Sequence, residues 1–153
     1  MKILIATDGT KQGETAIAAL SNFKLTAADE VKIVSVVDMA VPLAIDVYGG
    51  YLADTTELEK ASRDHANRIL DAAISSAKTI SSENEMSVSG EVLFGSPESR
   101  IVEAAEKMTA DLIIVGSHGY NRWERLLLGS VSDSVVHHAP CSVLIVRNRD
   151  VKA

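Results

Sequence analysis

Residues 111–119 read Asp-Leu-Ile-Ile-Val-Gly-Ser-His-Gly, and after nine further residues the chain continues Gly129-Ser130-Val131. The apolar run Leu112–Val115 predicts a buried strand, and the residues after Gly129 follow helical spacing. A glycine-rich turn between a strand and a helix presents backbone N–H groups, and the helix N-terminus adds a partial positive charge. Because glycine has no Cβ, the backbone at such a turn can approach an anion closely. This stretch therefore predicts a nucleotide site.

Five short apolar runs predict the strands of one sheet. They are Ile3–Ala6, Val31–Val37, Val88–Phe94, Leu112–Val115 and Val143–Val146. Four of these runs are rich in β-branched residues and nearly continuous, which is typical of strands buried on both faces of a parallel sheet. The run Val88–Phe94 is interrupted by Ser89, Gly90 and Glu91, and this interruption favours a place near an edge.

Helical patterns lie between the apolar runs. The residues expected on their apolar faces are Ala16, Ile17, Leu20 and Phe23 in the first, Leu58, Ala61, His65, Ile69, Ala72 and Ile80 in the second, Ile101, Val102, Ala105 and Met108 in the third, and Val131, Val135 and His138 in the fourth. Ser96-Pro97-Glu98 is a start signal for the third helix. The alternation of strand and helix predicts an α/β fold, with an open parallel sheet covered by helices on both faces. We expect a single domain over residues 1–153.

Composition narrows the possible partners. The formal net charge of −6 argues against broad electrostatic binding of nucleic acid or of an anionic membrane, since both need a basic face. No stretch approaches the roughly 20 apolar residues that span a bilayer. Cys141 is the one cysteine, so an intrachain disulfide is excluded and a reducing, cytoplasmic location is expected. The long irregular segment 39–54 is interpreted either as a lid or protein-partner surface or as a plain connection.

Several polar residues flank the predicted turns. Asp8 ends the first strand, where it could accept hydrogen bonds from a ribose or adenine, hold a metal, or cap the following helix. Ser130 could cap its helix or donate its hydroxyl group to a phosphate. Arg122 is equally consistent with a phosphate contact and with a solvated loop position. For His118, contact with phosphate is favoured over acid–base catalysis, because no partner acid lies nearby in the sequence.

Three nucleotide and hydrolase motifs are absent. The chain has no G-x-x-x-x-G-K-[ST], no G-x-G-x-x-G opening the first helix and no G-x-S-x-G. These absences argue against a P-loop NTPase, a dinucleotide-binding Rossmann domain and an α/β-hydrolase.

With G-x2-G-x9-G-S at Gly116, Gly119, Gly129 and Ser130, the chain resembles the nucleotide-binding branch of the universal stress protein family. The opening Ile3–Gly9 and the ending Ala139–Arg147 are also similar to that family, so the resemblance covers essentially the whole chain. It implies a Rossmann-like sheet, of the adenine nucleotide alpha hydrolase type, in the order 3-2-1-4-5. In that order the first and fourth strands are neighbours, and Asp8 lies close to Gly116.

The resemblance also implies a ligand and its contacts. The residues expected to bind ATP, or ADP or AMP, are Ala6, Thr7, Asp8, Val36, Gly116, Ser117, His118, Gly119, Arg122, Gly129, Ser130, Val131 and Ser132. Adenine would lie near Ala6 to Asp8 and the Val36 backbone, and the phosphates would lie at Gly119 and residues 129–132. Mg²⁺ or Mn²⁺ commonly accompanies such phosphates, and family members typically form homodimers through the last strand, here residues 143–146.

Two functions remain open for such a protein. One is a nucleotide-dependent regulatory or sensor module in a stress response, and the other is a slow ATPase or phosphotransferase. Rapid phosphoryl transfer needs a positioned base and strong neutralisation of charge at the γ-phosphate. The predicted phosphate loop contains no lysine and no clear base, so the sequence favours binding over catalysis.

Overall fold

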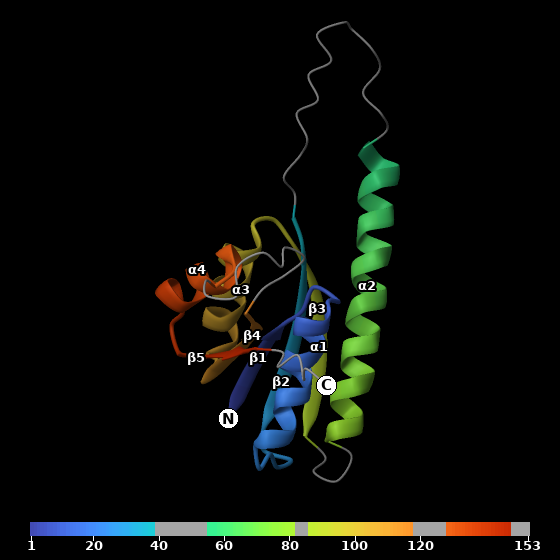
Figure 1. Cartoon of the computed structure of the whole chain (residues 1–153). Coiled ribbons are helices and arrows are strands. Elements are labelled where there is room, and N and C mark those ends of the chain that lie inside the picture. Colours follow the sequence, from blue (N-terminus) through green and yellow to red (C-terminus); the bar gives the residue numbers. More distant parts are fainter. Residues whose placement is uncertain (39–54, 82–85, 118–127, 148–153) are drawn as a thin grey trace, which may run out of the picture.

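The five apolar runs form one parallel sheet in the order β3-β2-β1-β4-β5, as expected from the sequence. A computed structural model describes residues 1–38, 55–81, 86–117 and 128–147 of the chain (Figure 1). The elements are β1 (Lys2–Ala6), α1 (Lys11–Ala18), the 3-10 helix η1 (Ala19–Asn22), β2 (Glu30–Val37), α2 (Thr55–Ile80), β3 (Ser87–Phe94), α3 (Pro97–Met108), β4 (Leu112–Gly116), α4 (Ser130–His138) and β5 (Ser142–Val146). Residues 39–54, His118, Gly119 and Arg122, for which the sequence makes predictions, lie outside the described residues.

The order of the strands creates a switch point at the centre of the sheet. β1 pairs with β2 on one side and with β4 on the other, in the register Ile5 to Ile33 and Ile5 to Ile114. β2 continues to the β3 edge, whereas β4 continues to the β5 edge. Ligands of open α/β sheets bind outside the carboxyl ends of the strands at such a point. A ligand is therefore expected at the turns that follow β1 and β4.

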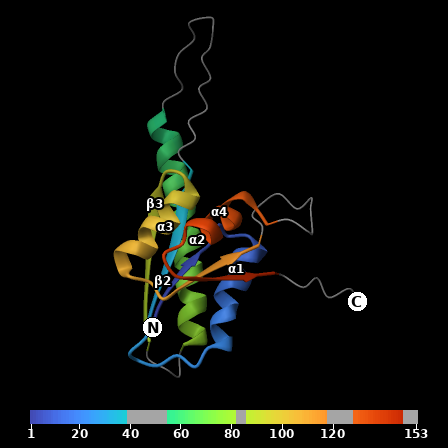
Figure 2. The same ribbon diagram turned by 90° about the vertical axis from the view of Figure 1, so that its left-hand side faces the viewer.

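Two apolar cores cover the two faces of the sheet. Because side chains alternate along a strand, Ile3 and Ile5 of β1 pack on one face and Leu4 packs on the other. All three are fully buried. The first core contains side chains from α1 and α2, and the second contains side chains from α3 and α4. The helices accordingly form one layer on each side of the sheet (Figures 1 and 2).

The buried face of α2 differs from the predicted one. The residues that pack on the sheet are Ala66, Leu70, Ala73 and Ala77, all less than 9% exposed. Of the face expected from the sequence, Leu58, Ala61, His65 and Ala72 are exposed, and Ile69 and Ile80 are partly buried. The prediction was therefore wrong for the exposed members of this face, whereas Ile80 does pack against the core. The helix carries two apolar stripes, and the one through Ala66 and Leu70 is the more deeply buried.

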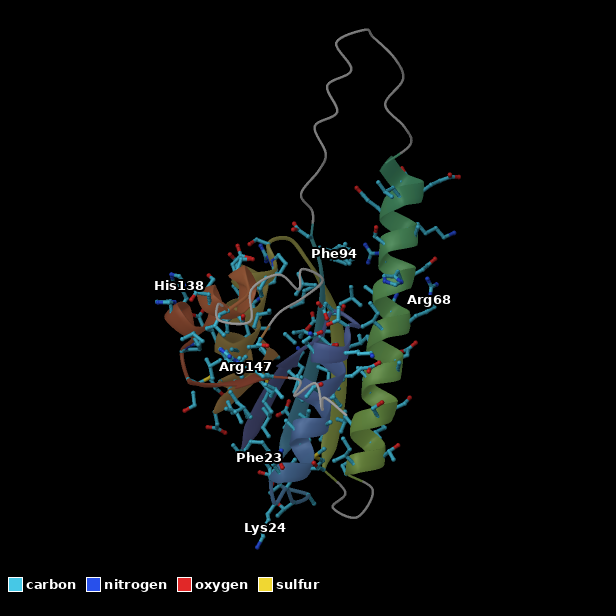
Figure 3. All side chains as sticks on the ribbon, viewed as in Figure 1. Phe23, Lys24, Arg68, Phe94, His138 and Arg147 are labelled. Atoms are coloured by element: carbon cyan, nitrogen blue, oxygen red, sulfur yellow. The ribbon has the colours of Figure 1, made fainter. Side chains whose placement is uncertain are left out.

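The ends of the other helices differ in smaller ways from the expectation. α1 ends at Ala18 and is followed by η1, so Phe23 lies beyond the helix in an extended conformation, although its side chain still packs against the core. His138 is exposed in the last turn of α4 (Figure 3). Near the carboxyl end of β3, the Arg63 guanidinium lies 4.3 Å from the centre of the Phe94 ring, which holds α2 to this edge of the sheet. No described helix is both long and apolar enough to cross a membrane.

Candidate functional site

The turn after β1 lies at the centre of the carboxyl edge, which is the edge of the sheet formed by the C-terminal ends of its parallel strands. The Thr7 N–H donates to the Val34 carbonyl over 3.0 Å, which keeps Thr7 in line with the sheet. The chain then reverses at Gly9, whose φ of +75° suits glycine. The Gly9 N–H donates to Thr7 Oγ1 over 3.3 Å. The turn is therefore fixed by its own hydrogen bonds, and it positions Asp8 at the switch point.

Asp8 supports the start of α1 without capping it. The N-cap of α1 is Thr10, whose hydroxyl oxygen accepts from the Gly13 N–H. Asp8 Oδ1 in turn accepts from the Thr10 N–H over 3.0 Å and from the Thr10 hydroxyl over 2.6 Å. The alternative prediction that Asp8 caps this helix was wrong, because the cap is Thr10, two residues later. Asp8 instead forms an Asx-type turn that holds Thr10 in the capping position. Asp8 itself remains partly exposed at the edge.

Close packing explains the first glycine of the motif. A Cβ at Gly116 would lie 2.8 Å from Gln12 Cβ and 3.1 Å from the Gln12 carbonyl. Since backbone cannot yield as a flexible side chain does, α1 can approach the end of β4 only if residue 116 is glycine. The sequence interpretation assigned this glycine to anion approach, and the structure adds a packing reason for it.

Gly13 is a second close contact, and the sequence analysis did not single it out. A Cβ at this position would collide with Thr7 Oγ1 and would lie 3.2 Å from Asp8 Oδ1. The signal was present, because a glycine in the first turns of a helical pattern lowers helix propensity and commonly has a packing reason. Gly13 lets the N-terminal turn of α1 pack directly on the β1 turn, which helps to position Asp8.

Hydrogen bonds join the end of β4 to the start of α4. The Ser117 N–H donates to the Val146 carbonyl over 2.9 Å, and the Ser117 carbonyl accepts from the Gly129 N–H over 2.8 Å. Ser132 Oγ lies 3.1 Å from the same carbonyl and 2.9 Å from the Gly129 carbonyl. The ends of the segment between β4 and α4 are thus held together, with Ser117 and Ser132 both buried.

The N-terminus of α4 begins at Gly129, which is its N-cap. Within the part of the chain that the structure describes, no side chain makes a capping hydrogen bond to this helix. The prediction that Ser130 caps the helix was wrong, because Ser130 is already the first helical residue and its side chain is exposed. The N–H groups of Ser130, Val131 and Ser132 have no intrahelical acceptor, since helix geometry leaves the first turn unsatisfied. A phosphate at this position would accept from them and would meet the positive end of the helix dipole.

The remaining predicted contacts are distributed around these turns. Ala6 and Val36 are partly buried and pack against the core on the α3 and α4 face. Within the described residues, no group of three or more His, Cys, Asp or Glu side chains is arranged to hold a metal ion. In the described parts of the two turns, the groups that could contact a ligand are backbone N–H groups, hydroxyl groups and the Asp8 carboxylate.

The strand order and the switch between β1 and β4 define a doubly wound α/β protein. A family model described as the Universal stress protein family matches residues 1–147, and the chain belongs to this family. A relative from Staphylococcus aureus strain USA300 is 36% identical, over 99% of this chain and 86% of the relative.

Solved structures agree with this assignment. The universal stress protein UspA from Lactobacillus plantarum is 25% identical with a TM-score of 0.75, over 96% of this chain and 97% of that protein. A family protein from Arabidopsis thaliana, solved with AMP bound, has the same fold with a TM-score of 0.67 at 17% identity, over 98% of this chain and 93% of that protein.

Proposed function

We propose that this protein binds ATP at the carboxyl edge between β1 and β4 and acts as a nucleotide-dependent regulatory or sensor module in a stress response. The observation that carries the proposal is the N-terminus of α4, which no described side chain caps and which follows the strand beside Asp8. An uncapped helix N-terminus attracts an anion, and an adjacent carboxylate suits the hydroxyl groups of a ribose.

The two ends of the nucleotide would use different groups. Adenosine would lie against Ala6, Thr7 and the backbone of Val36, with its ribose between Asp8 and Gly116. The phosphates would accept from the N–H groups of residues 130–132 and from the Ser130 hydroxyl. The Gly129 N–H already donates to the Ser117 carbonyl, so it would not donate to a phosphate. The absence of a side chain at residue 129 would instead let a phosphate approach the backbone closely. Ser117, His118, Gly119 and Arg122 complete the proposed set.

ATP is the form of adenine nucleotide that this donor set favours. The Arabidopsis neighbour with bound AMP supports an adenine nucleotide of some kind in this fold. The N-terminus of α4 supplies N–H donors on the far side of the proposed ribose position. A chain of several phosphates would accept from more of these donors than a single phosphate would. Mg²⁺ or Mn²⁺ would be held mainly by the phosphates and would neutralise part of their charge.

The edge strand β5 suggests how two copies would assemble. β5 pairs with β4 on one side and forms the edge of the described sheet on its other side. It is apolar from Val143 to Val146, and an unprotected edge of this kind is a template for pairing. We infer a homodimer through this strand, in the cytoplasm, with segment 39–54 as a candidate surface for a protein partner.

The decisive experiment identifies the resident nucleotide. Freshly purified protein, never exposed to added nucleotide, is denatured and the released small molecules are measured by mass spectrometry. Near-stoichiometric ATP is expected, because tight binding with negligible turnover would retain it. Calorimetry then compares ATP with GTP, and equal or undetectable binding of both would contradict the proposal.

A further inference from the structure

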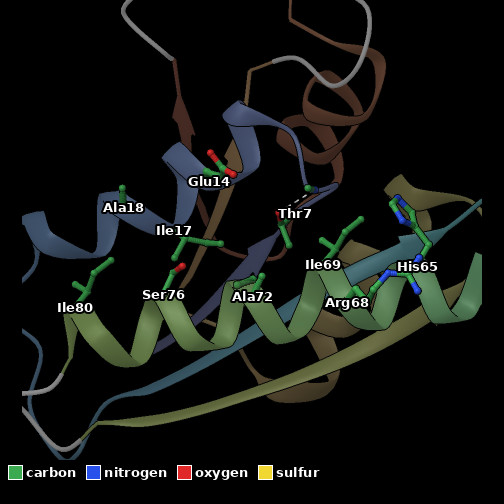
Figure 4. A pocket seen from close by; sticks show the side chains of 12 residues that line it. Thr7, Glu14, Ile17, Ala18, His65, Arg68, Ile69, Ala72, Ser76 and Ile80 are labelled. Atoms are coloured by element: carbon green, nitrogen blue, oxygen red, sulfur yellow. Dashed lines mark hydrogen bonds between the residues drawn. The ribbon is translucent and has the colours of Figure 1, made fainter.

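A groove between α1 and α2 lies away from the proposed phosphate site. Its volume is about 530 Å³, and it is lined by the second apolar stripe of α2 and by α1. Ile69, Ala72 and Ile80 of α2 contribute apolar surface, and Ile17 and Ala18 of α1 contribute it from the facing helix (Figure 4). The C-terminal part of the α2 stripe predicted to pack on the sheet, from His65 to Ile80, therefore lines this groove.

The groove is chemically asymmetric along its length. Figure 4 shows His65 and Arg68 at one end, Ile80 and Ala18 at the other, and Glu14 on the α1 side between them. Among the described residues, Arg68 forms no ion pair. A cationic end joined to an apolar floor matches an amphipathic anion, whose charged head and apolar chain need different surroundings.

We propose that this groove binds a long-chain carboxylate, with its head at Arg68 and its chain along Ile69, Ala72 and Ile80. From residue 68 to residue 80 the helix rises about 18 Å, so the groove is long enough for an extended acyl chain. A carboxylate accepts two N–H groups from one guanidinium, and this pairing would fix the orientation of the ligand.

The volume of the groove and the charges along it favour a long-chain carboxylate over other ligands. Pockets for small molecules commonly measure about 300–1,000 Å³. The groove, at about 530 Å³, falls within this range. The Glu14 carboxylate lies partway along the groove and would repel a ligand that carries several negative charges. A single carboxylate at the far end avoids this repulsion.

The test uses dodecanoate below its critical micelle concentration and the intact protein. Isothermal titration calorimetry should show one site per chain. Arg68→Gln should weaken binding about tenfold, because it removes a charge-assisted pair. Ala72→Trp should abolish binding by filling the groove. The matched controls are Lys78→Gln and Ser75→Trp, which alter exposed residues of α2 outside the groove lining and should leave the affinity unchanged.

Each other outcome overturns the proposal. Absence of dodecanoate binding at 1 mM, well above any specific affinity, would do so. Binding that survives Ala72→Trp would place the ligand elsewhere. If sedimentation shows self-association that Ala72→Trp removes while dodecanoate fails to bind, a second copy occupies the groove instead. Unfolding curves for every variant confirm that the fold is intact, and ATP titrations separate this site from the nucleotide site.

Discussion

The hydroxyl oxygen of Ser132 lies 3.1 Å from the carbonyl oxygen of Ser117, and this contact joins the first turn of α4 to the end of β4. Because a hydroxyl group donates only one hydrogen, the Ser117 and Gly129 carbonyls share it. Ser132 thus fixes the position of the α4 N-terminus from the buried side, whereas the Ser130 side chain is exposed to solvent.

Replacing Ser132 should therefore affect folding as well as binding. Ser132→Ala leaves buried carbonyl groups with one donor fewer, which should cost about 1–2 kcal/mol of unfolding free energy. Urea unfolding measures this cost. Ser130→Ala is the matched control, and its unfolding free energy should stay within about 0.5 kcal/mol of the parent while its ATP affinity falls. Equal stabilities for the two variants would contradict the assigned roles.

The first and third motif glycines should respond differently to a small side chain. Gly116→Ala places a Cβ against Gln12 and should destabilise the fold by about 1–3 kcal/mol. Gly129 has φ of −64° and ψ of 154°, which any residue adopts, so Gly129→Val should keep the fold, lose no more than about 1 kcal/mol through a poorer N-cap, and lose ATP affinity. Thermal unfolding and ATP calorimetry on both variants check this contrast. Unchanged ATP affinity in Gly129→Val would contradict the proposed phosphate site.

Asp8 should contribute to adenosine binding as much as to ATP binding. Asp8→Ala should weaken the binding of both ligands by about 1–3 kcal/mol, as expected for the loss of a hydrogen-bond acceptor that the bound ligand would cover. Asp8→Asn retains an oxygen for the Thr10 hydrogen bonds. This variant therefore tests the contribution of the negative charge to binding while the turn keeps its conformation. Calorimetry with adenosine and ATP makes the comparison. A loss confined to ATP would identify Asp8 as a metal ligand instead.

Acid should weaken the fold through Asp29. The Met1 amine and hydrogen bonds from Thr26 lower the pKa of the Asp29 carboxyl from its ordinary value of 3.8 to about 2. Because the folded pKa is the lower one, this stabilisation is fully present above pH 3.8 and is lost as the pH falls through about 2. Carboxyl NMR titration should find the depressed pKa, and Asp29→Asn should flatten the dependence of stability on pH in this range. A titration midpoint near 3.8 would contradict the prediction.

The edge strand should make the protein dimeric. Sedimentation equilibrium at micromolar concentration should give about twice the chain mass of 16.3 kDa. Dilution series locate the dissociation constant. A single species of chain mass at 100 μM, a concentration at which most specific dimers persist, would remove the case for pairing through β5.

The strands were predictable because their signal is redundant. Each apolar run lies within an observed strand, and the bounds differ by one residue, as with Ile3–Ala6 against Lys2–Ala6. The interrupted run Val88–Phe94 is indeed at an edge. Buried parallel strands need apolar side chains on both faces, so no choice of face is required.

The face of α2 was not predictable in the same way. Its two stripes, one through Ala66 and Leu70 and the other through Ile69 and Ala72, have the same helical spacing. Alanine is tolerated both in cores and on surfaces, so composition does not distinguish them. The helical pattern around Gly13 does indicate a packing reason for a glycine, but the partners that Gly13 and Gly116 contact depend on where α1 packs against the sheet.

Thr7 and Gly9 belong both to the groove and to the turn that would hold the nucleoside. A Cβ at Gly9 would meet Ile69, so this turn rests directly on α2. Where one ligand changes the position of this turn, it also changes the affinity for the other, and the factor is the same in both directions. Dodecanoate and ATP are therefore expected to alter each other's affinity by one common factor.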